Sequence, residues 1–134
     1  MALNRSSQWL CLCAVFALCF TLRIGVGGVI DATVPVVKHA DVYSDIAVNL
    51  ARGHGFVAEA GGEPIIWRAP LYPAFLAAVY ALFGEQNETG VFIAQSALDS
   101  VTAVLIFYMG TRLFGETVGL LSAVSFALHP LSAY

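Results

Sequence analysis

Two carboxylates, Asp41 and Asp45, are the side chains of this sequence best suited to proton transfer. Their spacing of four places both on one face of a helix. A carboxylate held where water meets lipid can accept a proton or a hydrogen bond from an incoming hydroxyl or amine. An aspartate that opens a helix can equally well act as an N-cap, and an exposed one can simply be solvated. Asp41 is therefore the first catalytic candidate and Asp45 the second.

Arg68 is the candidate anion-binding residue, because it stands just before Pro70, where an apolar stretch begins. A guanidinium at the edge of the bilayer offers a planar fork of donors to a lipid-linked phosphate. The alternative is an arginine that snorkels to the interface. Trp67 and Tyr72 can flank a lipid or an acceptor, but aromatic residues also collect at membrane interfaces without any substrate.

These residues must be positioned by elements that lie in a membrane. Of all residues 59% are apolar and 11% are charged, and the mean hydropathy is +0.80. Such values lie outside the range of soluble globular proteins, so the lipid bilayer is the expected partner. The six basic residues are scattered singly, which excludes the basic stripe that a nucleic-acid-binding protein needs.

Three apolar stretches predict transmembrane helices, at residues 9–30, 91–110 and 118–134, after a cytoplasmic N-terminus at 1–8. A helix needs about 20 residues to cross the hydrocarbon core. The first stretch exceeds the apolar run of a secretory signal peptide, so we expect an uncleaved anchor. The sequence thus predicts an all-α multi-pass membrane protein.

A polar segment, residues 31–89, separates the first two crossings. Apolar residues at helical spacing predict an amphipathic helix at 41–52, with Gly53 at the position of a C-terminal cap. A short hairpin is expected around Gly61-Gly62, since this pair suits the positive φ angles of a tight turn.

The apolar stretch 70–83 is shorter than a usual crossing, which favours an interfacial or re-entrant helix. If it does not cross, three crossings place Arg5 and Arg112 on the cytoplasmic side and the segment 31–89 outside, as the positive-inside rule requires. A fourth crossing at 70–83 would obey the rule less well.

Other chemistry-bearing residues suggest structural roles. Asp99 within the second crossing needs a partner, for which Arg23 in the first is a candidate. The three cysteines lie together in the first apolar stretch and behave as small apolar residues. The sequence contains no nucleotide-binding loop and no metal-ligand spacing, so we expect neither a cofactor nor a metal.

The order of motifs resembles the start of membrane glycosyltransferases with the GT-C fold, especially bacterial relatives of protein O-mannosyltransferases and of the lipid A aminoarabinose transferase. The motifs are DVYSDIAVNLARGHGF (41–56), RAPLYPAFLAAVYALFG (68–84), QSALDSVTAVLIFYMGTRLFG (95–115) and ALHP (127–130). As an ordered set they extend over most of the chain, although each one alone is weakly specific.

This resemblance implies sugar transfer from a polyprenyl-phosphate donor to a glycan, lipid or protein acceptor on the extracytoplasmic face of the cell membrane. It assigns the essential acid of the first outer loop to Asp41, or to Asp45, and contact with the carrier phosphate to Arg68. Tyr43 and Tyr72 are further candidates for substrate binding. In the family the acid lies a few residues further upstream of the tyrosine, where this sequence has His39.

Relatives of this kind run to several hundred residues, so the resemblance implies that the chain is the N-terminal part of a longer enzyme and inactive by itself. The alternative is a non-enzymatic small membrane protein or a helical subunit of a membrane complex. Whether the reading frame continues past Tyr134 discriminates between these two functions.

Overall fold

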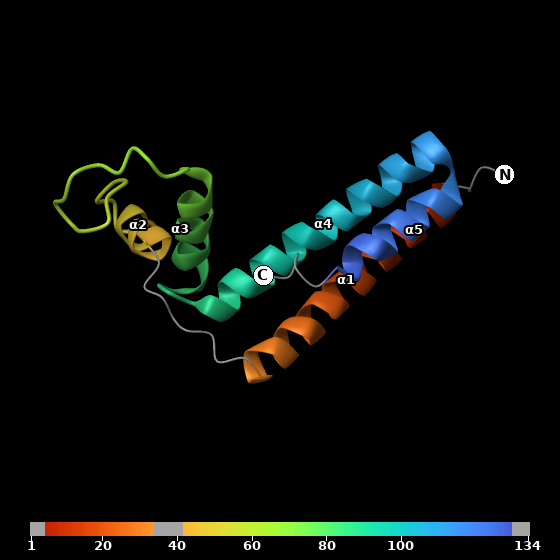
Figure 1. The fold of residues 1–134 in the computed structure, drawn as a ribbon, viewed down its shortest axis with the longest axis horizontal. Coiled ribbons are helices and arrows are strands. Elements are labelled where there is room, and N and C mark those ends of the chain that lie inside the picture. The colour runs from red at the N-terminus through yellow and green to blue at the C-terminus, as the bar shows by residue number, and fades with distance from the viewer. Residues whose placement is uncertain (1–4, 34–41, 130–134) are drawn as a thin grey trace. The chain divides into compact units, whose positions relative to one another are not determined.

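The computed structural model describes residues 5–33 and 42–129, and every regular element in these ranges is an α-helix (Figure 1). The five helices are α1 (Arg5–Thr33), α2 (Val42–Ala51), α3 (Leu71–Phe83), α4 (Glu88–Phe114) and α5 (Glu116–Ala127). They divide into two compact units. The long-helix unit is Met1–Pro35 with Gln95–Tyr134, and the loop unit is Val36–Ala94, so α4 begins in one unit and continues in the other.

Two of the described helices are long and apolar enough to cross a bilayer, α1 through its stretch Trp9–Val26 and α4 over its whole length. They correspond to the crossings predicted at 9–30 and 91–110. The third predicted crossing, 118–134, is helical up to Ala127 in the described residues. Its last residues lie outside the described part of the chain, so this crossing stays a prediction.

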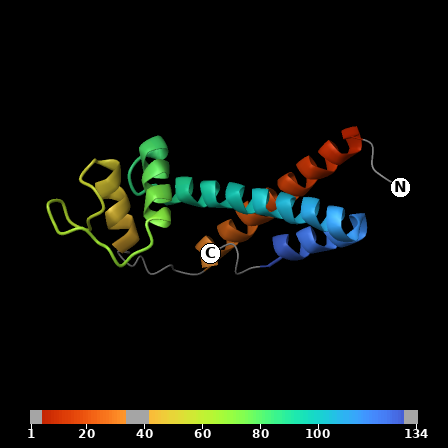
Figure 2. The same ribbon diagram turned by 90° about the horizontal axis from the view of Figure 1, so that it is seen from above.

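α4 and α5 form a tight helical hairpin within the long-helix unit (Figures 1 and 2). Gly115 alone separates them, with a φ of 95° that favours glycine. A Cβ on Gly110 would lie 2.7 Å from the Cα of Gly119, and a Cβ on Gly119 would lie 2.7 Å from the carbonyl oxygen of Phe107. Small residues let membrane helices approach this closely. The segment between the crossings predicted at 91–110 and 118–134 therefore contains one non-helical residue, Gly115.

Arg23 of α1 joins the three helices of this unit. Its side chain is 2% exposed, and its Nε lies 3.6 Å from Oδ2 of Asp99 on α4. The guanidinium also makes long hydrogen bonds, 3.5 Å each, to the carbonyl oxygens of Phe126 and His129 at the C-terminal end of α5. The expected Arg23–Asp99 pair is confirmed, and the carbonyls at the end of α5 gain a donor.

In the loop unit α2 and α3 pack side by side (Figure 2). Ala47 from α2 and Leu76, Ala77 and Tyr80 from α3 form a buried core. A hydrogen bond of 3.1 Å between the hydroxyls of Ser44 and Tyr80 also joins the two helices. The predicted helix 41–52 is confirmed as α2, and its apolar side is the one that faces α3.

The expected C-terminal cap of α2 is also confirmed. Gly53 has a φ of 80°, and its N–H donates to the carbonyl of Leu50 at 3.1 Å. The N–H of His54 donates to the carbonyl of Asn49 at 2.8 Å. Together these two bonds make a Schellman motif, which ends the helix and turns the chain back along it.

The expected hairpin around Gly61-Gly62 does not form as a pair of strands. The turn itself is present, since Gly61 has a φ of 81° and the N–H of Gly62 donates to the carbonyl of Glu59. Across it, the described residues show one backbone bond, from the N–H of Ile65 to the carbonyl of Phe56. Other carbonyls of this segment are bound by a side chain of α2, described below.

The predicted helix 70–83 is confirmed as α3, although whether it touches or crosses a bilayer stays a prediction. Asn87 links it to α4. Its Nδ2 donates to the carbonyl of Phe83 and its Oδ1 accepts from the N–H of Gly90, both at 2.8 Å. Asn87 thus caps the N-terminus of α4 and fixes the polar turn between the two helices.

Candidate functional site

Arg68 lies half-buried at the entrance to α3, against two aromatic rings. Its Nη1 donates to the hydroxyl of Tyr43 at 3.4 Å. The centre of its guanidinium is 4.9 Å from the ring centroid of Tyr43 and 4.6 Å from that of Trp67. Cation–π contacts of this length hold the guanidinium in place without neutralising its charge.

The aromatic contacts continue along α3. The ring of Tyr72 meets that of Tyr43 edge-on at 5.6 Å, and it stacks with Phe75 at 6.4 Å. We call Tyr43, Trp67, Arg68 and Tyr72 the arginine cluster. Tyr43 belongs to α2 and Tyr72 to the first turn of α3, whereas Trp67 and Arg68 lie just before α3. Trp67 is 68% exposed and Tyr72 41%, so the cluster is open on one side.

Arg68 retains donor capacity in this setting. Its Nε is buried and has no hydrogen-bond partner among the described residues. A guanidinium carries five N–H donors, of which the cluster engages one. The donors that the cluster does not engage suit an anion such as a phosphate or carboxylate.

Arg68, Tyr43 and Tyr72 lie together in the structure, but neither acidic candidate is seen beside them. Asp41 lies outside the described residues. Asp45 is half-buried on α2, two positions after Tyr43, and therefore points roughly 200° away around the helix axis. The described geometry places Asp45 on the face of α2 opposite the arginine cluster.

Sequence reasoning missed Asn49, a buried polar residue of α2. Its Nδ2 lies 2.8 Å from the carbonyl oxygen of Ala58, 3.2 Å from that of Val57 and 3.1 Å from that of Asp45. Its Oδ1 lies 3.2 Å from Nδ1 of His54. The sequence does place an asparagine among apolar residues of a predicted helix. A buried amide at such a position needs hydrogen-bond partners from elsewhere in the chain, so Asn49 could have been predicted to bind the backbone.

An exposed ion pair connects the residues that follow α2 and α3. Arg52, just after α2, binds Glu85, just after α3, through two nitrogens, with Nε at 2.7 Å from Oε1. The hydrogen bond from Arg52 lowers the pKa of Glu85; desolvation opposes this shift, and the positive charge of Arg52 adds a smaller lowering. The same hydrogen bond raises the pKa of Arg52.

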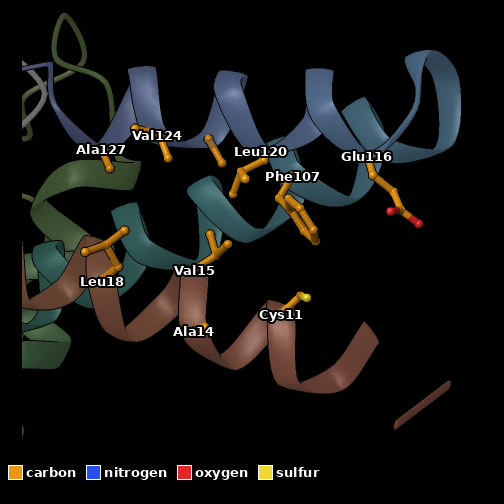
Figure 3. Close-up of a pocket in the computed structure, with 10 residues that line it drawn as sticks. Cys11, Ala14, Val15, Leu18, Phe107, Glu116, Leu120, Val124 and Ala127 are labelled. Atoms are coloured by element: carbon orange, nitrogen blue, oxygen red, sulfur yellow. The ribbon is translucent and has the colours of Figure 1, made fainter. Parts of the chain in front are cut away.

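The described residues contain no group of three metal-ligating side chains. The long-helix unit holds an apolar groove of about 340 Å³ between α1, α4 and α5 (Figure 3). Glu116 is the one charged residue of its lining and lies at the start of α5. Such a surface suits hydrocarbon or another helix, and no residue in it is arranged for chemistry.

Comparison with known proteins gives one finding. The family model described as dolichyl-phosphate-mannose-protein mannosyltransferase matches residues 67–134. The matched range begins at Trp67 and contains Arg68, Tyr72 and helices α3 to α5, whereas Tyr43 and both acidic candidates precede it. No curated protein and no solved structure shows a significant match to the chain.

Proposed function

Because the chain belongs to the dolichyl-phosphate-mannose-protein mannosyltransferase family, which consists of membrane glycosyltransferases, we propose the following reaction for it. The protein moves a sugar from a polyprenyl-phosphate donor to a glycan, lipid or protein acceptor on the extracytoplasmic face of the cell membrane. The chain supplies the arginine cluster and the acidic loop residues to this reaction.

The arginine cluster is the observation that carries the proposal. In a direct displacement the lipid phosphate leaves with the electrons of its bond to the sugar, so negative charge grows on the phosphate. Preorganised donors aimed at growing charge are among the strongest catalytic devices. Arg68 has such donors, and Tyr43 and Trp67 hold its guanidinium in place.

The acceptor needs a group that orients its hydroxyl or amine. We assign this role to Asp41, which belongs to the polar segment that precedes Arg68. Asp45 is the second choice, because it lies on the face of α2 opposite the arginine cluster. The segment is extracytoplasmic in this proposal, with Arg5 and Arg112 on the opposite side of the membrane. Three crossings satisfy that arrangement.

The test is sugar transfer by the full natural product of the gene, in vesicles supplied with a polyprenyl-phosphate sugar. Arg68→Ala should reduce kcat/KM for the donor by about 10²-fold or more, as the loss of a charge-stabilising donor does elsewhere. Asp41→Asn should abolish transfer. Arg52→Gln, which removes one positive charge from the same unit away from the cluster, should leave transfer intact.

Two outcomes would overturn the proposal. One is a wild-type protein that transfers no sugar from any polyprenyl-phosphate donor. The other is an Arg68→Ala variant that uses the donor as well as the wild type. Full activity in Asp41→Asn would instead move the orienting role to Asp45, and Asp45→Asn then decides it.

A further inference from the structure

Helix α3 is apolar on two opposite faces. It contains no charged residue, and one face forms the core with α2. The residues of the opposite face recur every three or four positions and are exposed, at Leu71, Ala74, Ala78 and Leu82. We call these four residues the outer face of α3. Leu71 and Leu82 are 81% and 79% exposed. A helix that is apolar all round needs an apolar partner on each side.

Two more exposed apolar side chains stand just before α3. Ile66 is 92% exposed, and the ring of Trp67 is also largely exposed. Arg68, the next residue, turns its guanidinium toward Tyr43 on α2. A tryptophan and an arginine beside exposed aliphatic side chains are typical of the boundary between lipid and water.

The C-terminal end of α3 is attached to the beginning of α4. Asn87 binds the carbonyl of Phe83 and the N–H of Gly90, as described above. A Cβ on Gly90 would lie 3.0 Å from the Cβ of Phe83, so the last residue of α3 packs against the first turn of α4. Since α4 is long and apolar enough to cross a bilayer, the outer face of α3 ends beside the start of a candidate membrane span.

The direction and the length of α3 suit a helix that lies along a membrane surface. In both views α3 runs across the direction in which α4 begins (Figures 1 and 2). Its 13 residues make a helix of about 20 Å, which is shorter than the hydrocarbon core of roughly 30 Å. When α4 crosses the bilayer, α3 therefore lies near the plane of the membrane.

We propose that the outer face of α3 rests in the lipid of the leaflet that α4 enters, with the helix axis along the membrane surface. Acyl chains are the apolar partner of the outer face, and Trp67 lies at the headgroup level. Arg68 then lies among headgroup phosphates, which carry the opposite charge. This proposal concerns the position of the loop unit and does not depend on the proposed transferase function.

Spin labels on the 134-residue chain in phosphatidylcholine vesicles test the proposal. The cysteines of α1 are first replaced by alanine, and one nitroxide is then attached at Leu71→Cys, Ala78→Cys or Leu82→Cys, all exposed positions. Collisions with oxygen, which concentrates in lipid, and with a water-soluble nickel chelate give the depth of each label. We expect the three labels to lie in lipid at one shallow depth.

Two further labels calibrate the depth. Glu63→Cys, an exposed position in the same unit, should be fully accessible to the nickel chelate. Val101→Cys lies near the middle of α4, where the side chain is 46% exposed, and should be protected from the chelate and reached by oxygen. The outer face of α3 should lie between these two references.

Trp67 supplies a second measurement, for which no label is needed. The chain has two tryptophans, so Trp9→Phe leaves Trp67 as the single reporter. We expect lipids brominated in the upper part of the acyl chain to quench its fluorescence more strongly than aqueous iodide does. The opposite ranking would place Trp67 in water and overturn the proposal.

Three results of the labelling would also overturn it. Access of the nickel chelate to the outer face equal to that at Glu63 would place this face in water. A label at Ala78 as deep as the one at Val101, with shallow labels at Leu71 and Leu82, would show that α3 crosses the bilayer. Protection of all three labels from both reagents would show that protein, such as a second copy of the chain, occupies the outer face.

Discussion

Arg23 on α1 and Asp99 on α4 form an ion pair within the long-helix unit, with 3.6 Å between Nε and Oδ2. The arginine is buried at 2% exposure, whereas the aspartate side chain is 31% exposed. The same guanidinium reaches the last carbonyls of α5 and lies 5.5 Å from the ring centroid of Phe126. One side chain therefore connects three helices in apolar surroundings, where an isolated charge would be costly.

Removal of one partner should destabilise this unit more than removal of both. Arg23→Leu should lower the free energy of unfolding by about 3–5 kcal/mol, because it leaves a carboxylate without its cation. Asp99→Leu should cost less, since Arg23 keeps its bonds to α5. Denaturation in detergent of both single variants and the double variant measures the coupling, and additivity within about 0.5 kcal/mol would contradict the pair.

The α4–α5 hairpin should tolerate no side chain at Gly119. Gly119→Ala would press a methyl group against Thr111 and Phe107, so we expect a loss of about 1–3 kcal/mol. Gly25→Ala in α1 is the matched control, because a Cβ there meets nothing within 4 Å. Its thermal unfolding temperature should be unchanged or higher. Equal effects of the two substitutions would contradict the close approach of the hairpin.

The Arg52–Glu85 pair should stabilise the loop unit only above acid pH. The pKa of Glu85 is lowered in the folded state, so its contribution is present above the unfolded value, about 4.5, and is lost as pH falls through the folded value. Wild type and Glu85→Gln should differ in unfolding temperature at pH 7 and converge at low pH. Added salt should also reduce the difference, because the pair is exposed.

Asn49 should be the most important single polar residue of the loop unit. Asn49→Ala leaves the carbonyls of Val57 and Ala58 without their donor, at a cost of about 1–3 kcal/mol. Limited proteolysis should then cleave the segment between α2 and α3 faster. Ser44→Ala, which removes one hydrogen bond to Tyr80, is the milder control. Equal cleavage rates would show that Asn49 does not hold the segment.

Much of the helical architecture was predictable, because apolar length and period are local properties of the sequence. α1 and α4 were expected as crossings, α2 with its Gly53 cap, and α3 as a short apolar helix. The prediction of a hairpin around Gly61 was wrong because a side chain from another part of the chain binds the backbone there. In the register of the Ile65–Phe56 bond, the strands would next need the carbonyl of Ala58, and the amide of Asn49 binds it instead.

The candidate site was predictable only in part. Arg68, Tyr43 and Tyr72 were expected as binding residues, but their contact depends on the packing of α2 against α3, which no local pattern encodes. The Asn49–His54 contact was not predicted, because it depends on how the Asn49 amide is oriented in the fold. The roles of Asp41 and Asp45 stay predictions.

During synthesis, α1 leaves the ribosome well before Asp99 is made. An arginine within a membrane helix is costly to insert, so Arg23 makes α1 a poor candidate for early release into lipid. Its counter-ion and the carbonyls of α5 arrive with the later helices. We therefore expect the insertion machinery to retain α1 until α4 and α5 have emerged.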